Sequence, residues 1–285
     1  MATRAPSRRR SAADARDAVR RRAAAVVRAS GMRRPPFAPE RYAAKCGVAA
    51  IIAGAPEGGP VRVELRGAVD GGAQRTLIVV DRRLPPHTPQ WNGAIALGLG
   101  ETMVPPGVAG EARRALTEAA AADLLLPAAS FRPAAAGTDL TMDGLRDLAA
   151  RFAAPLRLTA RQWLSVGLWH GFALLWREDN GALRLGWRAA SSGRFPPSLA
   201  LGADAAAVWA PESRLFATHR TGRAHHGVEE VHTGAGTAWW FTRFATVRDG
   251  AGDAGAAARR AVFAMVMLAP GASRRPQGIP SGPSK

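Results

Sequence analysis

Apolar residues recur every three or four positions near the start of the chain, which is the period of an amphipathic helix. The positions that carry this pattern are Ala12, Ala15, Val19, Ala23, Val26 and Val27. Ser11 followed by Asp14 resembles a capping box, and Gly31 is suited to end a helix. We therefore expect a helix over residues 12–30.

The middle of the chain alternates short β-type patterns with longer helical ones. A short helix is predicted from Pro39 to Cys46, ended by Gly47. Predicted strands cover residues 48–52, 61–65 and 76–80, and predicted helices cover residues 91–104, 111–126, 142–152 and 159–166. Gly98 and Gly100 weaken the helix at 91–104 by about 1 kcal/mol each relative to alanine.

From residue 169 onward the pattern becomes that of β-structure. Two apolar runs, at 172–177 and 183–188, flank Asn180-Gly181, which is the strongest hairpin signal in the sequence. Further strands are predicted at residues 205–209, 237–247 and 260–268, and six of the eight tryptophans fall at or after residue 169. The Pro-, Gly- and Ser-rich residues 269–285 predict disorder. The fold class is therefore α+β.

Composition excludes several classes of protein. The 285 residues contain one cysteine, so a disulfide framework or a cysteine-rich zinc motif is excluded. The sequence contains no uninterrupted run of about 18 apolar residues, so a transmembrane helix is not expected. The net charge is +17, and eleven arginines with only Asp14 and Asp17 place +9 of it in residues 1–36. The candidates for a nucleic-acid contact there are Arg8, Arg9, Arg10, Arg20, Arg21 and Arg22; the alternative is a solvated helix face.

Several short blocks, in a particular order, resemble the ImmA/IrrE family of zinc metallopeptidases. These blocks are a Pro-rich helix entry at residues 35–40, a strand ending IVVD at 78–81, a buried helix, and a second helix ending ADLLLP at 122–127. The resemblance covers residues 12–165. Proteins of this family are cytoplasmic and bacterial, and they cleave helix-turn-helix repressors. The resemblance implies a zincin-like helical domain with a small mixed sheet (the IrrE N-terminal-like domain), and a cytoplasmic location.

The family's catalytic residues are missing at the matching positions. In the family, the buried helix carries two zinc-binding histidines at i and i+4 with a glutamate base after the first. Those three positions fall on Leu97, Glu101 and Gly98. A shift of the register by two residues also finds no histidine. The resemblance therefore implies a degenerate metal motif without catalytic residues.

The resemblance also places acidic residues on the next helix. They fall on Arg114 and Leu116, and Glu118 is the nearest carboxylate.

A metal site rebuilt elsewhere has few candidate ligands. His226, Glu230 and His232 would share one face of a strand, and the alternative is a polar loop. Together with Glu101 and Glu118 they are the candidate metal ligands. Cys46, beside Lys45, is either a nucleophile or a buried core residue. No cofactor is expected, and zinc would be present only in an active enzyme.

Two later segments have alternative interpretations. Residues 140–166 have the appearance of a helix-turn-helix in which Arg157, Arg161 and Gln162 would read DNA; alternatively the pair packs under the peptidase-like domain. The Trp-rich part resembles the β-rich, GAF-like sensor module of some longer family members. Its aromatic residues would line a ligand pocket or form ordinary sheet core.

These observations divide the chain into five segments. We expect a basic N-terminal helix or tail (1–36), a peptidase-like domain (37–135), a helical pair (136–168), a Trp-rich module (169–268) and a disordered tail (269–285).

The leading hypothesis is a pseudo-metallopeptidase that regulates by binding a protein partner such as a helix-turn-helix repressor. One alternative is an active metallo-endopeptidase with a rebuilt site that cleaves such a repressor. The other is a nucleic-acid-binding regulator that acts through the arginines of the N-terminal segment.

Overall fold

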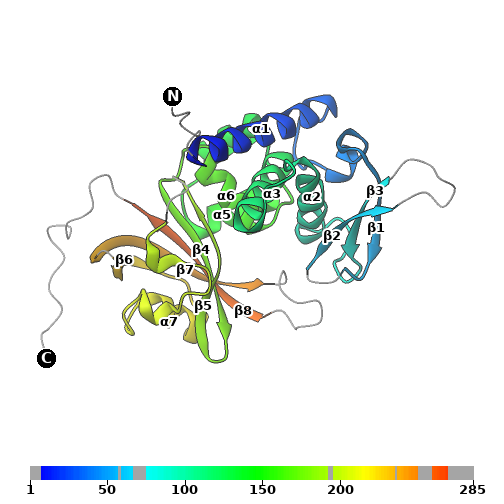
Figure 1. Cartoon of the computed structure of the whole chain (residues 1–285). Coiled ribbons are helices and arrows are strands. Elements are labelled where there is room, and N and C mark those ends of the chain that lie inside the picture. The colour runs from blue at the N-terminus through cyan, green and yellow to red at the C-terminus, as the bar shows by residue number, and fades with distance from the viewer. Residues whose placement is uncertain are drawn as a thin grey trace, which may run out of the picture. The chain divides into compact units, whose positions relative to one another are not determined.

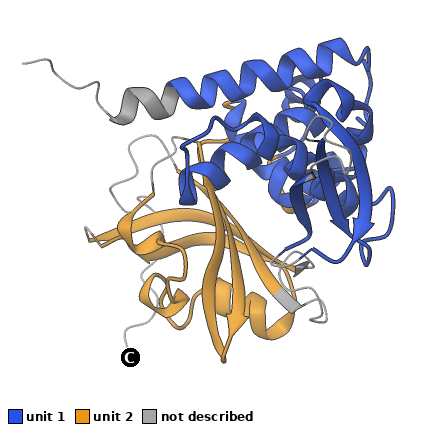
Figure 2. Cartoon of the chain, turned by 45° about the vertical axis from the view of Figure 1, so that its right-hand side comes forward, with its two compact units in different colours: residues 1–139, 143–166, 250–256 blue, residues 140–142, 167–249, 257–285 orange. Residues whose placement is uncertain are grey.

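The structure is a computed structural model that describes residues 8–56, 59–66, 75–191, 195–234, 236–249 and 259–268. Within these residues the fold is α+β, with seven α-helices, a mixed three-stranded sheet and an antiparallel five-stranded sheet (Figure 1). The chain separates into two units, coloured in Figure 2. Unit 1 comprises residues 1–139, 143–166 and 250–256, and unit 2 the remainder. Among the described helices, none combines the length and apolar composition that a bilayer-spanning helix requires.

The sheet of unit 1 confirms the three predicted strands. β1 (Val48–Gly54) pairs in parallel with β3 (Arg75–Asp81), which pairs antiparallel with β2 (Val61–Arg66). The central strand β3 has buried apolar side chains at 78–80. This apolar centre supplies the surface on which the following helix packs.

Helix α2 (Pro89–Met103) crosses β2 and β3 and lies against α3 (Gly110–Leu125). Thr88 caps α2 by accepting a hydrogen bond from the Trp91 amide. A Cβ on Gly100 would lie 2.5 Å from the carbonyl oxygen of Thr117 in α3. The glycine that weakens α2 locally is therefore needed for the close approach of the two helices.

Helix α1 (Arg8–Ala29) packs on α3 with one apolar face. Val19, Ala23, Val26 and Val27 are buried there. The helix begins at Arg8, so Ser11 and Asp14 lie inside it and the predicted capping box is wrong; Gly31 follows its end with a φ of +72°. The basic N-terminal helix is thus a packed part of unit 1, and not a free tail.

Three further helices complete unit 1. The predicted helical pair is confirmed as α5 (Met142–Arg151) and α6 (Leu156–Ser165), and α6 contacts α3 and α4 (Ala128–Ala136). The sequence analysis predicted that the helix at 111–126 ends at Pro127, and it predicted no helix at the position of α4. Pro127 also occupies the N-cap of α4, and proline suits a helix start as well as a helix stop.

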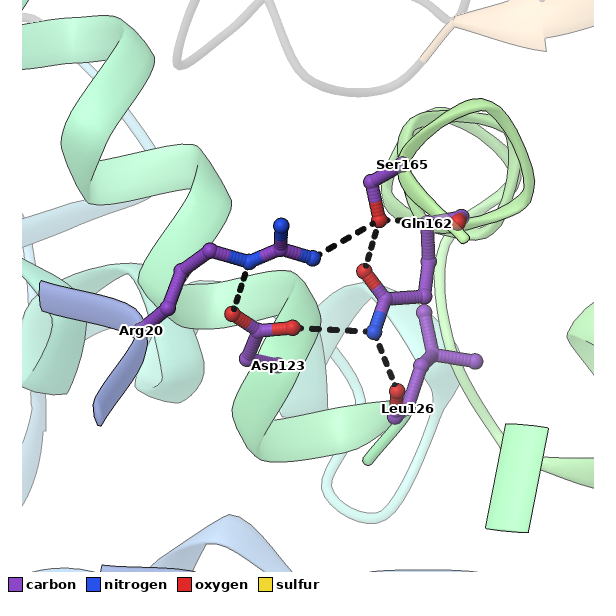
Figure 3. A network of polar contacts seen from close by, with 5 residues as sticks. All are labelled: Arg20, Asp123, Leu126, Gln162 and Ser165. Atoms are coloured by element: carbon purple, nitrogen blue, oxygen red, sulfur yellow. Dashed lines mark hydrogen bonds and ion pairs between the residues drawn. The ribbon is translucent and has the colours of Figure 1, made fainter. Parts of the chain in front are cut away.

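A buried polar network joins α1, α3 and α6 (Figure 3). The Asp123 carboxylate of α3 accepts hydrogen bonds from Arg20 Nε at 3.2 Å and from Gln162 Nε2 at 2.9 Å. Gln162 Nε2 also donates to the carbonyl oxygen of Leu126, and Gln162 Oε1 accepts from Ser165 Oγ at 2.7 Å. Arg20 reaches Ser165 Oγ at 3.2 Å. The cluster therefore links side chains of α1, α3 and α6 through Asp123 and Ser165.

Unit 2 is built on the five-stranded sheet. Its order is β5 (Ala182–Ala190), β4 (Gly171–Asp179), β8 (Arg259–Met267), β7 (Thr237–Asp249) and β6 (His225–His232), all antiparallel. The β4–β5 hairpin is confirmed, with φ of +50° at Asn180 and +80° at Gly181. The predicted disorder at 269–285 lies outside the described residues.

One face of this sheet is covered by two short helices that the sequence analysis did not predict. Residues 205–209 were predicted as a strand, which is wrong: Ala205–Ala207 form a 3-10 helix, because Asp204 caps the amide of Ala206. Helix α7 (Arg214–Thr221), capped by Ser213, is only eight residues long, which is about two helical turns. Trp209 packs edge-on against Trp240 and Phe244 of β7. The tryptophans thus build a sheet core.

Removing the Asp123 carboxylate tests whether the network holds the three helices together. Asp123→Ala should lower the free energy of unfolding by about 2–3 kcal/mol, because Arg20 and the buried Gln162 amide lose their acceptor. The control is Asp147→Ala at an exposed position of α5, which should change it by less than about 0.5 kcal/mol. Chemical denaturation measures both, and equal stabilities of the two variants would contradict the role of the network.

Candidate functional site

A cleft between α2 and α3 is lined by several of the residues singled out in the sequence of unit 1. Its volume is about 370 Å³. It is lined by Pro60, Leu97, Glu101, Gly110, Arg113, Arg114, Thr117, Glu118 and Arg157. We call it the α2–α3 cleft. Helix α6 contributes Arg157, and Pro60 directly precedes β2.

The structure brings together some of the residues that the resemblance assigns to a zinc site and separates others. Leu97 and Glu101 line the cleft because residues four apart share a helix face. Gly98 faces the sheet, and a Cβ there would lie 2.8 Å from Ile78 Cγ2. Leu116 is buried and does not line the cleft, whereas Arg114 does. The position assigned to the base therefore has no room for a side chain.

The Glu101 carboxylate is bound on both oxygens by α3. Arg113 Nε donates to Oε1 at 2.5 Å, and Thr117 Oγ1 donates to Oε2 at 2.7 Å. Arg113 also donates to the carbonyl oxygen of Val108. Glu101 thus connects α2 to α3. The sequence did not predict this contact, because Arg113 belongs to no recognisable motif.

The second carboxylate of the cleft, Glu118, forms an ion pair with Arg161 of α6. Both side chains are mostly buried, with exposed fractions of 17% for Arg161 and 13% for Glu118. Gln162 is buried in the Asp123 network. For Arg161 and Gln162, the structure therefore shows packing within unit 1 and not a surface that reads DNA.

Arginines dominate the electrostatics of this region. The cleft and its ion pairs hold four of them, Arg113, Arg114, Arg157 and Arg161, against Glu101 and Glu118. Helix α3 begins at the cleft with Gly110, and its N-cap residue Ala109 makes no side-chain cap. The positive end of the helix dipole adds to the field of the arginines.

The residues present do not fit a catalytic zinc ion. Such a site needs three protein ligands with nitrogen, sulfur or oxygen donors, and Glu101 and Glu118 are already engaged by arginines. Within the described ranges, no three histidine, cysteine or acidic side chains are arranged to hold a metal.

The histidine-rich segment forms the edge strand β6, so the strand interpretation is confirmed. His226, Glu230 and His232 are exposed at alternating positions of one face. However, His226 and Glu230 are four residues apart on a strand, which separates them by about 13 Å. Glu229, on the other face, is buried and pairs with Arg214 at 2.6 Å. The strand spacing therefore keeps the three candidate ligands from sharing one ion.

The arginines of α1 divide into two groups. Arg20 points inward to Asp123, whereas Arg21 and Arg22 are exposed. Arg16 is half-buried, and its pKa is lowered by burial and by the neighbouring Arg20 and Arg161. The side chains of Arg8, Arg9 and Arg10 lie outside the described residues. Of the described candidates for a nucleic-acid contact, Arg21 and Arg22 are therefore available at the surface, whereas Arg20 is paired with Asp123.

Cys46 is a buried thiol near α1. Burial raises its pKa to about 11, and the nearby Arg22 opposes this only in part. At neutral pH the group is therefore a thiol, and the thiolate is the nucleophilic form. The structure supports the core interpretation of this residue.

Alkylation measures this difference. At pH 7.5, iodoacetamide should modify Cys46 in the native chain about 100-fold or more slowly than in the chain unfolded in guanidinium, because the native pKa lies well above that of an exposed thiol. Mass spectrometry of timed samples gives both rates. Equal rates would show an accessible, reactive thiol and contradict the buried assignment.

Comparisons with known proteins add one likeness in fold. A scan of protein families finds no match, and a search of curated proteins finds none. Among solved structures, a Mycobacterium tuberculosis transcriptional regulator matches with a TM-score of 0.56 and 18% sequence identity. The match covers 87% of this chain and 76% of that chain. At this identity the two proteins share a fold over most of their length.

Proposed function

We propose that the chain is a non-catalytic regulatory protein that acts by binding a protein partner such as a helix-turn-helix repressor. In this proposal, unit 1 is a zincin-like scaffold of the ImmA/IrrE type that has lost its metal chemistry. Unit 2 is the sensor-like module that accompanies it. No residue of the α2–α3 cleft has a catalytic role.

One observation carries this proposal. Both carboxylates of the cleft, Glu101 and Glu118, are bound by arginines, and the position of the base is Gly98, pressed against Ile78. A carboxylate in a charge-assisted pair with arginine is stabilised in its ionised form and is a poor ligand unless that pair breaks. The cleft therefore has the geometry of a structural contact between helices, and not that of a hydrolytic centre.

The likeness in fold supports the regulatory half of the proposal. The M. tuberculosis protein is a transcriptional regulator, and its fold corresponds to 87% of this chain. A shared fold does not determine function. Regulation is nevertheless the role that agrees both with this likeness and with a cleft whose carboxylates are engaged.

Metal analysis tests the loss of zinc chemistry. The full chain, purified without chelator and dialysed, should contain well under one zinc per chain by mass spectrometry of the metals. Glu101→Ala should leave that content unchanged, because Glu101 binds Arg113 and Thr117 instead of a metal. One tightly held zinc per chain that is lost in Glu101→Ala would overturn the proposal.

Genetic complementation tests regulation without catalysis. In a strain that lacks the gene, transcripts of the regulated genes should return to normal with the wild-type chain and equally with Glu101→Gln, which keeps a hydrogen-bonding group beside Thr117. Failure of Glu101→Gln at normal protein abundance would indicate that the carboxylate itself is needed. The partner is then sought by co-purification with a co-encoded helix-turn-helix repressor.

A further inference from the structure

We propose that an arginine-rich surface of unit 1 binds the sugar–phosphate backbone of double-stranded DNA without sequence preference. The surface consists of seven exposed cations on α1 and on the segment between α1 and β1: Arg21, Arg22, Arg28, Arg33, Arg34, Arg41 and Lys45. We call it the arginine surface. The inference does not depend on the proposed function, because it concerns neither the α2–α3 cleft nor the protein partner.

Contacts between α1 and the segment that follows it bring these cations into one region. Helix α1 contacts the 3-10 helix η2 (Ala44–Cys46). The charge of Arg22 acts on the thiol of Cys46, so these two side chains are close to each other. Ser30, just after α1, is a hydrogen-bonding neighbour of the tyrosine that ends the 3-10 helix η1 (Pro39–Tyr42). The second half of α1, the turn after it and both 3-10 helices are therefore neighbours, and the seven cations lie on them.

The arginine surface has almost no acidic groups to neutralise it. Residues 18–56 contain eight cations and one acid, Glu40, whose carboxylate accepts a hydrogen bond from an indole of α2 at 3.1 Å. Of the eight cations, Arg20 turns inward to Asp123, and within the described part of the chain the other seven form no ion pair. The nearest acid along α1 is Asp17. Such a surface attracts a polyanion, and the release of counterions from DNA drives the binding.

The chemistry of the arginine surface favours a nucleic acid over a membrane or a protein. The apolar side of α1 is buried on α3, so this helix has no free apolar face to insert into a bilayer. Among the described residues, the exposed large hydrophobic side chains are Leu65 and Leu201, and neither belongs to the surface. The aromatic and apolar anchors on which protein interfaces depend are thus missing. Guanidinium groups bind phosphate oxygens in a bidentate manner, and six of the seven cations are arginines.

The residue types that the surface lacks identify the form of nucleic acid. Single strands are bound by stacking their bases on aromatic side chains, and both aromatic residues of this region, Phe37 and Tyr42, are buried. Proteins distinguish RNA from DNA through the 2′-hydroxyl. Residues 18–56 contain no threonine, asparagine or glutamine, and the hydroxyl of Ser30, their one serine, donates to the carbonyl oxygen of Val27. Phosphate contacts from arginine and lysine remain, and these position a DNA duplex without reading its sequence.

The salt dependence of DNA binding tests this inference. The full chain is titrated into a fluorescently labelled DNA duplex of mixed sequence, and the association constant K is measured by anisotropy at KCl concentrations between about 50 and 200 mM. A plot of log K against log[KCl] should have a slope of about −3 or steeper, since each neutralised phosphate contributes about −0.9. Arg33→Gln/Arg34→Gln should reduce the magnitude of this slope by about 1 to 2 and weaken binding about tenfold at the lowest salt concentration, because two phosphate contacts are lost. Arg21→Gln/Arg22→Gln should have the same effect.

A matched control removes the same charge elsewhere in unit 1. Arg132→Gln/Arg151→Gln changes exposed arginines of α4 and α5 and should leave the slope unchanged. An equal loss of affinity in this control would show a response to net charge alone and overturn the inference. Denaturation midpoints equal to that of the wild type show that a variant has lost binding and not its fold, and the two arginine pairs provide independent tests.

Other outcomes would identify a different site or partner and also overturn the inference. Binding that is lost only in Arg8→Gln/Arg9→Gln/Arg10→Gln would place the contact outside the arginine surface. Tighter binding of single-stranded DNA or of duplex RNA with the same sequence would contradict the assignment to duplex DNA. Binding to phosphatidylserine vesicles without binding to DNA would identify a membrane surface instead. The metal content and the complementation test measure the proposed function separately, so either proposal can fail without the other.

Discussion

The arrangement of unit 1 depends on the hydrogen bonds that the Asp123 carboxylate accepts. It lies buried in the last turns of α3 and is satisfied only because α1 brings Arg20 to one oxygen and α6 brings Gln162 to the other. A buried carboxylate without such donors would destabilise the fold, so the three helices have to assemble together. Helix α3 thereby becomes the common support of α1, α2 and α6, and three of the five charged residues that line the α2–α3 cleft, Arg113, Arg114 and Glu118, lie on it.

A second constraint is steric and sets the spacing of α2 and α3. Gly100 lets the backbone of α2 approach the carbonyl of Thr117, and Gly98 lets the opposite side of α2 lie on Ile78. Larger residues at either position would separate the layers. This close packing brings Glu101 within hydrogen-bonding distance of Arg113 and Thr117. The same geometry therefore stabilises the fold and engages the carboxylate that a metal would have needed.

Apolar residues, glycine and arginine occupy the positions of the cleft where the resemblance would place histidines and acids. Arg114 lines the cleft at a position where the resemblance places an acid. Glu101 and Glu118, the two acidic residues of the cleft, form ion pairs with arginines. A region of this charge repels cations and attracts oxyanions. The regulatory role that we propose requires no catalytic group in this cleft.

The sequence alone determined the elements with a strong local signal. The apolar period of α1, the strands around residues 48–80 and the Asn180-Gly181 hairpin were all predictable, because each depends on neighbours a few residues away. So was the absence of histidines at Leu97 and Glu101. Only the tertiary structure decided the role of each arginine: Arg20 and Arg161 look like surface charges, yet they pair with Asp123 and Glu118, 103 and 43 residues distant. Local patterns contain no information about such partners, and that is why the arginine-lined cleft emerged only from the folded chain.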